Sequence, residues 1–304
     1  MTRTVAPEVL TSGARPGRVL RILRGALRLA GVVPFGAYVA LGLIAPMIAI
    51  AIAAFQGNSG GYTFANISAA THGVYLTGLR TSIELSIATA IVPAIFGLLI
   101  AYAIHTAKRG TVLRQVVITA SGVFANFGGV PLAFLFISTL STTGLVTGWI
   151  KDLSGFQIWD HGFTLFGPEG VFFVYMYFQI PLLVLVILPA LEGLRPAWRE
   201  AAQNMGAGTW QYWRYVGGPV LLSPFIGCVL LLFGSAFSAY ATAEALTGGT
   251  ISLTPIQIGA LLNGNVLAGQ ENLGYALGLI MVVIIAVVMI FYVILQRRAA
   301  RWLR

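Results

Sequence analysis

The chain has 304 residues, of which 58 % are apolar and 9 % are charged, whereas soluble globular proteins carry about 25 % charged residues. This composition excludes an ordinary soluble enzyme, and recurrent uncharged stretches of more than about 18 residues are typical of membrane-spanning helices. The formal net charge of +9 suits either nucleic acid or a membrane surface, and the positions of the basic residues decide between them.

Residues 1–28 form a basic segment with arginines at positions 15, 18, 21, 24 and 28. Their roughly helical spacing fits a helix lying along the inner leaflet, and a disordered basic tail fits equally. The uncharged stretch that follows, Gly31–Phe55, exceeds the core of about 7 to 15 residues of a secretory signal, so we interpret it as a retained span.

Residues 29–304 are predicted to form one all-α, polytopic domain with six transmembrane helices. A lone strand would leave backbone amides unsatisfied in lipid, and the alternation of a membrane barrel is absent. With six crossings both termini face the cytoplasm, and every basic residue except Arg80 and Lys151 lies on that side. This positive-inside asymmetry makes the charge a topology signal, so no nucleic-acid partner is expected. The predicted spans are Gly31–Phe55, Leu85–Ile104, Val116–Leu140, Gly170–Leu191, Pro219–Ala243 and Asn272–Leu295.

Four polar or aromatic residues of the second, third and fourth spans are candidates for a solute pathway. Glu84 is the acid closest to a span interior, although Arg80 one helical turn earlier offers a simple ion pair. Asn126 and Gln179 either bond across the bundle or line a wet cavity. Tyr175 either forms a wall of the path or belongs to an interfacial aromatic belt.

The outer segment 141–169 contains the amphipathic stretch Gly148–Leu153 and then Trp159. This pattern predicts a short interfacial helix, which is either a cap over the bundle or a surface for an external partner.

The exit of the fifth span, Ser235–Glu244, is rich in small and polar residues. Ser238, Tyr240 and Glu244 are further pathway candidates, because such a surface can gate a modest cationic or zwitterionic solute. Plain helix packing explains it equally well. Neither the separated histidines nor the lone Cys228 suggests a metal site or a membrane-embedded enzyme.

The inner loop 192–218, between the fourth and fifth spans, carries the most specific signal. Pro196 is well placed to begin a short helix, which has Ala197, Trp198, Ala201, Ala202 and Met205 on one face. Gly206–Gly208 should end it, and Thr209 can cap a second segment before Gly217–Pro219 interrupts the chain at the membrane.

This loop resembles that of the permease subunits of binding-protein-dependent ABC importers, in which Glu-Ala-Ala is followed by three residues, Gly, nine residues and Ile-x-Leu-Pro. The chain has Glu200-Ala201-Ala202, Gly206 and Val216–Pro219 at these spacings, and it departs from the motif at Gly218, where leucine is expected. The resemblance implies the type I importer-permease fold. It also implies that the short helix, with Glu200, Ala201, Ala202, Gly206 and Ala207, docks on a separate ATPase.

The same resemblance implies a bacterial inner-membrane complex. It would contain two permease chains, identical or homologous, a dimer of ATP-binding subunits and an extracytoplasmic substrate-binding protein. The sequence has no Gly-x-x-x-x-Gly-Lys-Ser/Thr motif, so ATP and Mg²⁺ are expected on the partner ATPase and not on this chain.

The fifth-span exit resembles the polyamine, iron and aminophosphonate branch, which suggests a polyamine or a similar cationic or zwitterionic solute. The alternative is an ATP-independent carrier or channel. That class would require intramembrane ionisable residues for ion coupling and often has an inverted repeat, and the sequence shows neither.

Overall fold

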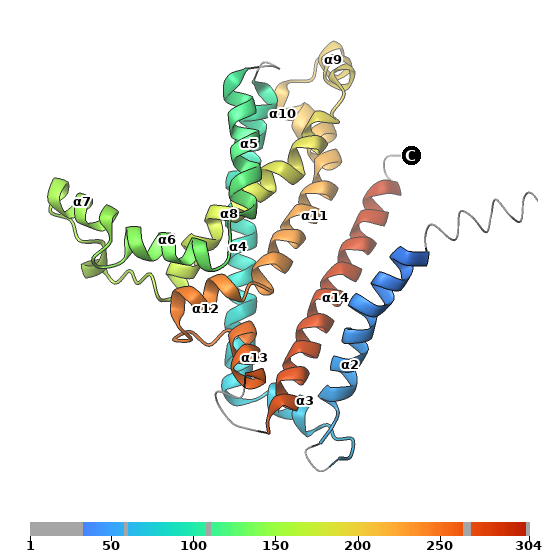
Figure 1. The fold of residues 1–304 in the computed structure, drawn as a ribbon. Coiled ribbons are helices and arrows are strands. Elements are labelled where there is room, and N and C mark those ends of the chain that lie inside the picture. The colour runs from blue at the N-terminus through green and yellow to red at the C-terminus, as the bar shows by residue number, and fades with distance from the viewer. Residues whose placement is uncertain (1–32, 58–59, 108–110, 264–268, 302–304) are drawn as a thin grey trace, which may run out of the picture. The chain divides into compact units, whose positions relative to one another are not determined.

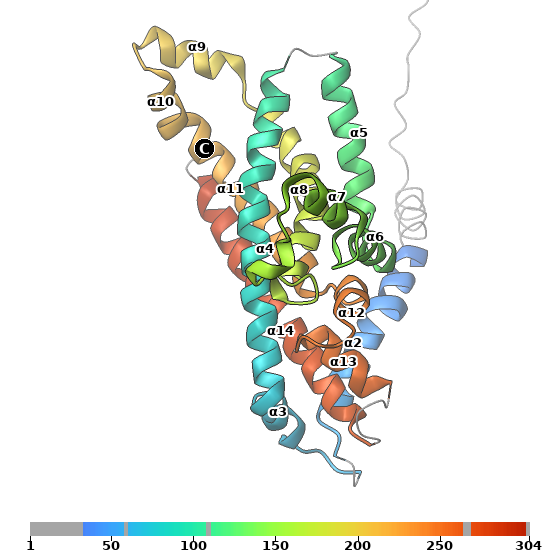
Figure 2. The same ribbon diagram turned by 90° about the vertical axis from the view of Figure 1, so that its left-hand side faces the viewer.

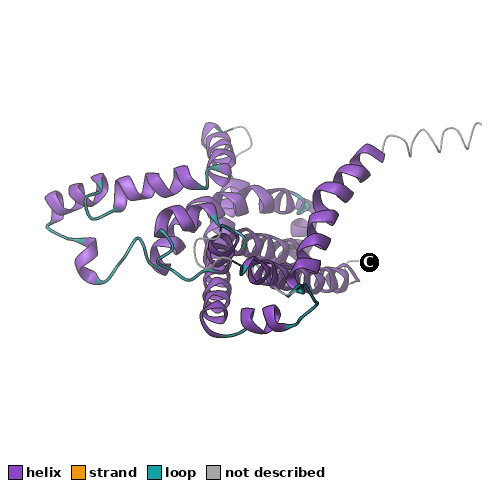
Figure 3. Ribbon diagram, turned by 60° about the horizontal axis from the view of Figure 1, so that its bottom comes forward, coloured by secondary structure: helices purple, strands orange, loops and turns teal. Residues whose placement is uncertain are grey.

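The computed structural model describes residues 33–57, 60–107, 111–263 and 269–301. Within these ranges every extended regular element is a helix (Figure 3). Six helical stretches are long and apolar enough to cross a membrane, which confirms the predicted fold class. They are Val33–Ala54, Gly73–Thr106, Val130–Ser154, Pro168–Glu192, Thr209–Phe237 and Glu271–Ile294. The chain separates into two compact units, residues 1–52 and 53–304, which are described separately.

In the first unit, the described residues belong to the span that begins at Val33. A π-helical turn, η1 (Ala40–Ile44), precedes α2 (Ala45–Ala54). Pro46 explains this irregularity, because a residue without an N–H leaves a carbonyl of the preceding turn unpaired. The basic segment 1–28 lies outside the described residues, so its proposed structure remains a prediction.

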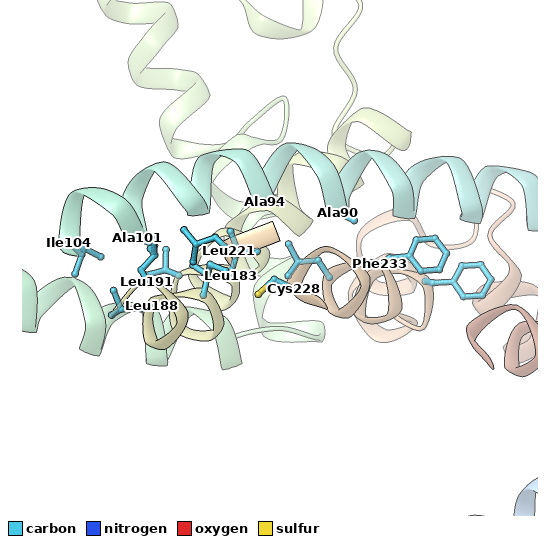
Figure 4. Close-up of a cluster of buried hydrophobic side chains, with 14 of the residues drawn as sticks. Ala90, Ala94, Ala101, Ile104, Leu183, Leu188, Leu191, Leu221, Cys228 and Phe233 are labelled. Carbon is cyan, nitrogen blue, oxygen red and sulfur yellow. The ribbon is translucent and has the colours of Figure 1, made fainter. Parts of the chain in front are cut away.

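One buried apolar cluster of the second unit is formed mainly by three helices: α4 (Gly73–Thr106), α8 (Pro168–Glu192) and α11 (Gly218–Phe237). Their buried aliphatic side chains make one cluster, in which alanines of α4 face leucines of α8 and α11 (Figure 4). Gly97 allows α4 and α8 to approach closely, because a Cβ atom there would lie 2.7 Å from Leu183 Cδ2. Small residues at such crossings are the usual means of packing helices within a membrane.

The predicted third span, Val116–Leu140, is wrong as one continuous helix. The structure has α5 (Val112–Asn126), then a turn, then α6 (Val130–Leu140) and α7 (Leu145–Ser154). Gly129 adopts a φ of +74° in that turn, a conformation that glycine accepts without steric cost, and Pro131 begins the next helix. α5 packs along α8, while α6 turns away from the axis of α5 (Figure 1).

α7 confirms that a short helix forms over Gly148–Leu153, while its interfacial position stays a prediction, and η2 (Ile158–His161) follows it. Outside the inner loop, the second unit also contains α3 (Ala65–Ala70), α12 (Ala241–Thr247), α13 (Thr254–Leu262) and α14 (Glu271–Arg301). The predicted fifth span, Pro219–Ala243, is wrong at its outer end, because α11 ends at Phe237 and α12 forms a separate helix.

Two ends of the second unit matter for function. The first carries the C-terminal end of α4, the start of α5 and α9 (Pro196–Asn204), which lie at the same end in both views (Figures 1 and 2). α3 and α13 lie at the opposite end. α13 is fixed to α4 by the Thr254 N–H, which donates to Ser82 Oγ at 2.8 Å, and by Gln257 Nε2, which donates to the Val74 carbonyl at 2.9 Å.

Candidate functional site

The inner loop forms the short helix that the sequence predicts. α9 begins with Pro196 in its first turn, where the missing N–H costs nothing. At the other end, the Ala207 N–H donates to the Ala202 carbonyl and the Gly206 N–H donates to the Gln203 carbonyl, both at 2.9 Å. These two bonds make a Schellman cap, which requires a left-handed residue. Gly206 supplies it with a φ of +80°.

The residues expected to contact an ATPase differ in their exposure. Glu200, Ala201 and Gly206 are exposed, Ala207 is half-buried, and Ala202 is buried against the chain itself. Glu200, Ala201 and Gly206 are therefore available to another protein, whereas Ala202 anchors the helix.

The predicted apolar face of α9 is not a single exposed surface. Trp198 is half-buried and packs on the core cluster, and the Arg195 guanidinium lies 5.8 Å from the centroid of its ring. Met205 is 81 % exposed. Sequence periodicity placed Trp198 and Met205 on the same face of the helix. It could not show that Trp198 packs against the cluster of α4, α8 and α11 while Met205 stays exposed.

The second segment of the loop differs from the prediction in its cap. Gly208, not Thr209, is the N-cap of α10 (Thr209–Tyr212). The Gln211 side chain folds back so that its Oε1 accepts the Gly208 N–H at 2.7 Å. This bond satisfies a backbone donor that a helix start leaves free, and Thr209 is the first residue of the helix instead of its cap.

The predicted interruption at Gly217–Pro219 is also wrong. A π-helical turn, η3 (Trp213–Gly217), joins α10 to α11 without a break. A Cβ atom on Gly218 would lie 2.5 Å from the Trp213 carbonyl oxygen. Glycine in place of the expected leucine at position 218 therefore leaves room for the wide π turn.

An open cavity of about 380 Å³ lies where α5 and α11 end and α12 begins. This volume is in the range of small-molecule sites. The described residues that line it carry amide, hydroxyl and aromatic groups but no formal charge: Ala125, Asn126, Gly128, Gly129, Phe178, Ser235, Ala239, Tyr240, Ala241 and Thr242. The Gly129 N–H donates to Thr242 Oγ1 at 2.8 Å, so the turn after α5 is bonded directly to α12.

Two of the predicted pathway residues, Asn126 and Tyr240, meet at this cavity. Asn126 Nδ2 donates to the Gly122 carbonyl of its own helix at 2.9 Å, and no bond from Asn126 to another helix is seen among the described residues. The Tyr240 ring packs on α13, since a Cβ atom on Gly259 would lie 2.8 Å from the ring.

Tyr175 and Gln179 do not line the cavity. The Tyr175 hydroxyl donates to the carbonyl of Ala239 at 3.1 Å and so supports one of the lining residues. Gln179 is fully buried, and its amide has no hydrogen-bond partner among the described residues. Among the described residues, Gln179 thus neither bonds across the bundle nor lines this cavity, the two alternatives that its sequence position left open.

The other three candidates do not line the cavity either. Glu84 pairs with Arg80 at 2.7 Å on the exposed surface of α4, as the simple ion-pair alternative predicts. Ser238 is exposed and its hydroxyl donates to the Gly234 carbonyl at 2.8 Å. Glu244 is half-buried, and its Oε2 atom has no partner among the described residues.

The sequence reasoning missed Phe178, Ser235 and Thr242 as lining residues. Ser235 and Thr242 lie in the small, polar fifth-span exit, which was the available signal. Phe178 carries no such signal, since an aromatic residue within an apolar span usually packs in the core. Within the described ranges, no group of three or more His, Cys, Asp or Glu side chains could hold a metal ion.

Comparison with known proteins identifies the family. Residues 94–301 match the family described as binding-protein-dependent transport system inner membrane component. Among curated relatives, the chain is 26 % identical over 170 residues to the thiamine transport system permease protein ThiP of Escherichia coli, covering 56 % of this chain and 30 % of that protein. It is 25 % identical over 229 residues to ThiP of Brucella melitensis, covering 73 % of this chain and 40 % of that protein. The chain thus spans less than half the length of these relatives.

Solved structures show the same fold. A chain of a bacterial ABC transporter involved in the import of the acidic polysaccharide alginate superposes with a TM-score of 0.71 at 20 % identity, covering 93 % of this chain and 99 % of that one. A chain from inward-facing conformations of the MetNI methionine ABC transporter gives a TM-score of 0.52 at 13 % identity, covering 75 % and 97 %. At these identities, the likeness concerns the fold alone.

Proposed function

Because the chain belongs to the family of binding-protein-dependent transport system inner membrane components, and is therefore the permease subunit of a bacterial ABC importer, we propose that the cavity at the end of α5 is part of its solute path. The observation that carries this proposal is the meeting of Asn126 and Tyr240 at an open, polar cavity beside a break in the helix. Within a membrane-spanning region, irregular backbone is tolerated where it lines a cavity.

In this proposal, the inner loop couples the path to a separate ATPase. The Schellman cap fixes the end of α9 and leaves Glu200 and Ala201 exposed. A second permease chain, two ATP-binding subunits that hold ATP and Mg²⁺, and an external binding protein complete the complex. Family membership favours this arrangement over an ATP-independent carrier or channel.

The solute is proposed to be a small organic cation. Phe178 and Tyr240 both line the cavity, and aromatic faces attract cations without requiring a charged residue. Thiamine, the solute named for the curated relatives, is an aromatic organic cation and is the first candidate. A polyamine is also a cation and is the second candidate, although the names of the curated relatives give thiamine and not a polyamine.

The test is uptake of labelled thiamine and of spermidine into proteoliposomes that contain the complete complex, with and without ATP. Replacement of Tyr240 by alanine removes a cation–π contact worth about 0.5 to 2 kcal/mol, so uptake should fall by about 2- to 30-fold. Tyr62→Ala is the matched control, because Tyr62 is exposed in a loop outside the cavity.

Two results would contradict the proposal at different levels. ATP-independent uptake would exclude the importer mechanism. ATP-dependent uptake of another solute, with neither cation transported, would leave the importer in place and exclude the proposed solute class.

A further inference from the structure

Arg114 and Glu192 form an ion pair between the first turn of α5 and the last residue of α8. Their side chains are 21 % and 36 % exposed, so the pair is partly shielded from water. The other ion pair in the described part of the chain, Arg80–Glu84, lies within one helix and is far more exposed. Arg114–Glu192 is thus an interhelical contact, and Glu192 immediately precedes the inner loop that carries α9.

The two charges are not placed to stabilise their own helices. A helix N-terminus favours an acidic side chain and a C-terminus favours a basic one. Arg114 lies at the N-terminal end of α5, and Glu192 lies at the C-terminal end of α8. Each charge is therefore at the unfavourable end of its helix, and the contact between the two helices is what compensates for this placement.

α5 connects this pair to the proposed solute path. The helix runs unbroken from Val112 to Asn126 and packs along α8. Asn126 lies 12 residues beyond Arg114, which corresponds to about 18 Å of α-helix. Asn126 lines the cavity, and just beyond it the Gly129 N–H bonds to Thr242 of α12. One continuous helix thus has an ion pair to the start of the inner loop at one end and a wall of the cavity at the other.

We propose that Arg114 and Glu192 are positioning residues that transmit movement of the inner loop to the cavity through α5. The inference rests on the proposed coupling function and adds the route by which movement of the inner loop reaches the cavity. When α9 is displaced by the ATPase, Glu192 moves with the end of α8. The ion pair then obliges α5 to follow, and the position of Asn126 at the cavity changes.

The test is a charge-reversal cycle in the complete complex, purified through a tag on this chain and reconstituted in lipid. The variants are Arg114→Glu, Glu192→Arg and the double reversal, with Arg114→Lys as the conservative substitution. Arg297→Glu is the matched control, because Arg297 is an exposed arginine near the end of α14. The readout is the ratio of the ATP hydrolysis rate with loaded binding protein to the rate without it.

Each single reversal should lower this ratio at least about fivefold, the lower range of coupling between distant sites. The basal rate and the assembly of the complex should be unchanged. The double reversal should restore the ratio to within about twofold of the wild type. Arg114→Lys should retain most of the coupling, and Arg297→Glu should behave as the wild type.

Amide hydrogen exchange over residues 122–129 gives a second readout that does not depend on ATP hydrolysis. Exchange there should rise in each single reversal and return in the double reversal, although Arg114 lies at the other end of α5 and Glu192 at the end of α8. Single reversals that keep full coupling, or a double reversal that assembles but stays uncoupled, would overturn the inference. If the wild-type complex itself shows no stimulated hydrolysis, the proposed function fails, and the exchange measurement still decides whether the pair controls α5.

Discussion

Replacement of Gly206 by alanine should weaken the end of α9 through the backbone alone. Gly206 has a φ of +80°, and a Cβ atom there would have no other atom within 4 Å. The cost of alanine is therefore the steric cost of a left-handed residue, about 1 to 2 kcal/mol. This cost shifts the equilibrium between the capped and the frayed helix end by about 5- to 30-fold.

The assay is ATP hydrolysis stimulated by the loaded binding protein in the reconstituted complex, over the series glycine, asparagine, alanine and valine at position 206. Stimulation should fall in that order, because asparagine tolerates the left-handed region better than alanine does, and a β-branched residue tolerates it least. An alanine variant with wild-type stimulation would refute the backbone argument.

Gly206→Trp separates backbone strain from docking. Like alanine, tryptophan at position 206 would have the steric cost of the left-handed backbone conformation, and it also adds a large side chain at an exposed position. If the ATPase is seated there, the tryptophan variant should insert in the membrane normally but lose stimulated hydrolysis completely. Equal residual stimulation in the alanine and tryptophan variants would show that no partner contacts this position.

Three further outcomes are expected. Gly97→Ala should lower the stability of the detergent-solubilised protein by about 1 to 3 kcal/mol in thermal unfolding, because the new Cβ atom meets Leu183 at the α4–α8 crossing. Gly218→Leu, which restores the residue typical of the family motif, should reduce both stability and coupling, since its Cβ atom approaches the Trp213 carbonyl oxygen. Glu84→Gln should leave uptake and thermal stability unchanged, because exposed ion pairs contribute little.

The controls for these substitutions come from the same chain. Gly122→Ala in α5 places a methyl group where no atom lies within 4 Å, so it should not reproduce the loss seen with Gly97→Ala. A Gly218→Leu variant with undiminished stability would mean that the π turn relaxes at no cost. A loss of uptake in Glu84→Gln would indicate that Glu84 does belong to the solute path.

Local signals in the sequence predicted the features that depend on neighbouring residues. Six apolar stretches predicted six spans because crossing a bilayer needs a run of about 20 apolar residues. Pro196 and Gly206 predicted the start and end of α9, since a missing N–H and a left-handed turn are properties of single residues. The error at Thr209 arose because Gly208 is the N-cap, where the Gln211 side chain accepts its N–H, and Thr209 is the first helical residue.

Tertiary structure alone decided which distant residues meet. Asn126 and Tyr240 come together at the cavity because α5 ends beside the α11–α12 junction, and Tyr175 and Gln179 turn into the packed core. Arg114 and Glu192 each look like an ordinary charge at a membrane boundary until α5 and α8 are packed side by side. Such contacts depend on how whole helices pack against each other, and the spacing of residues along one segment carries no information about that packing.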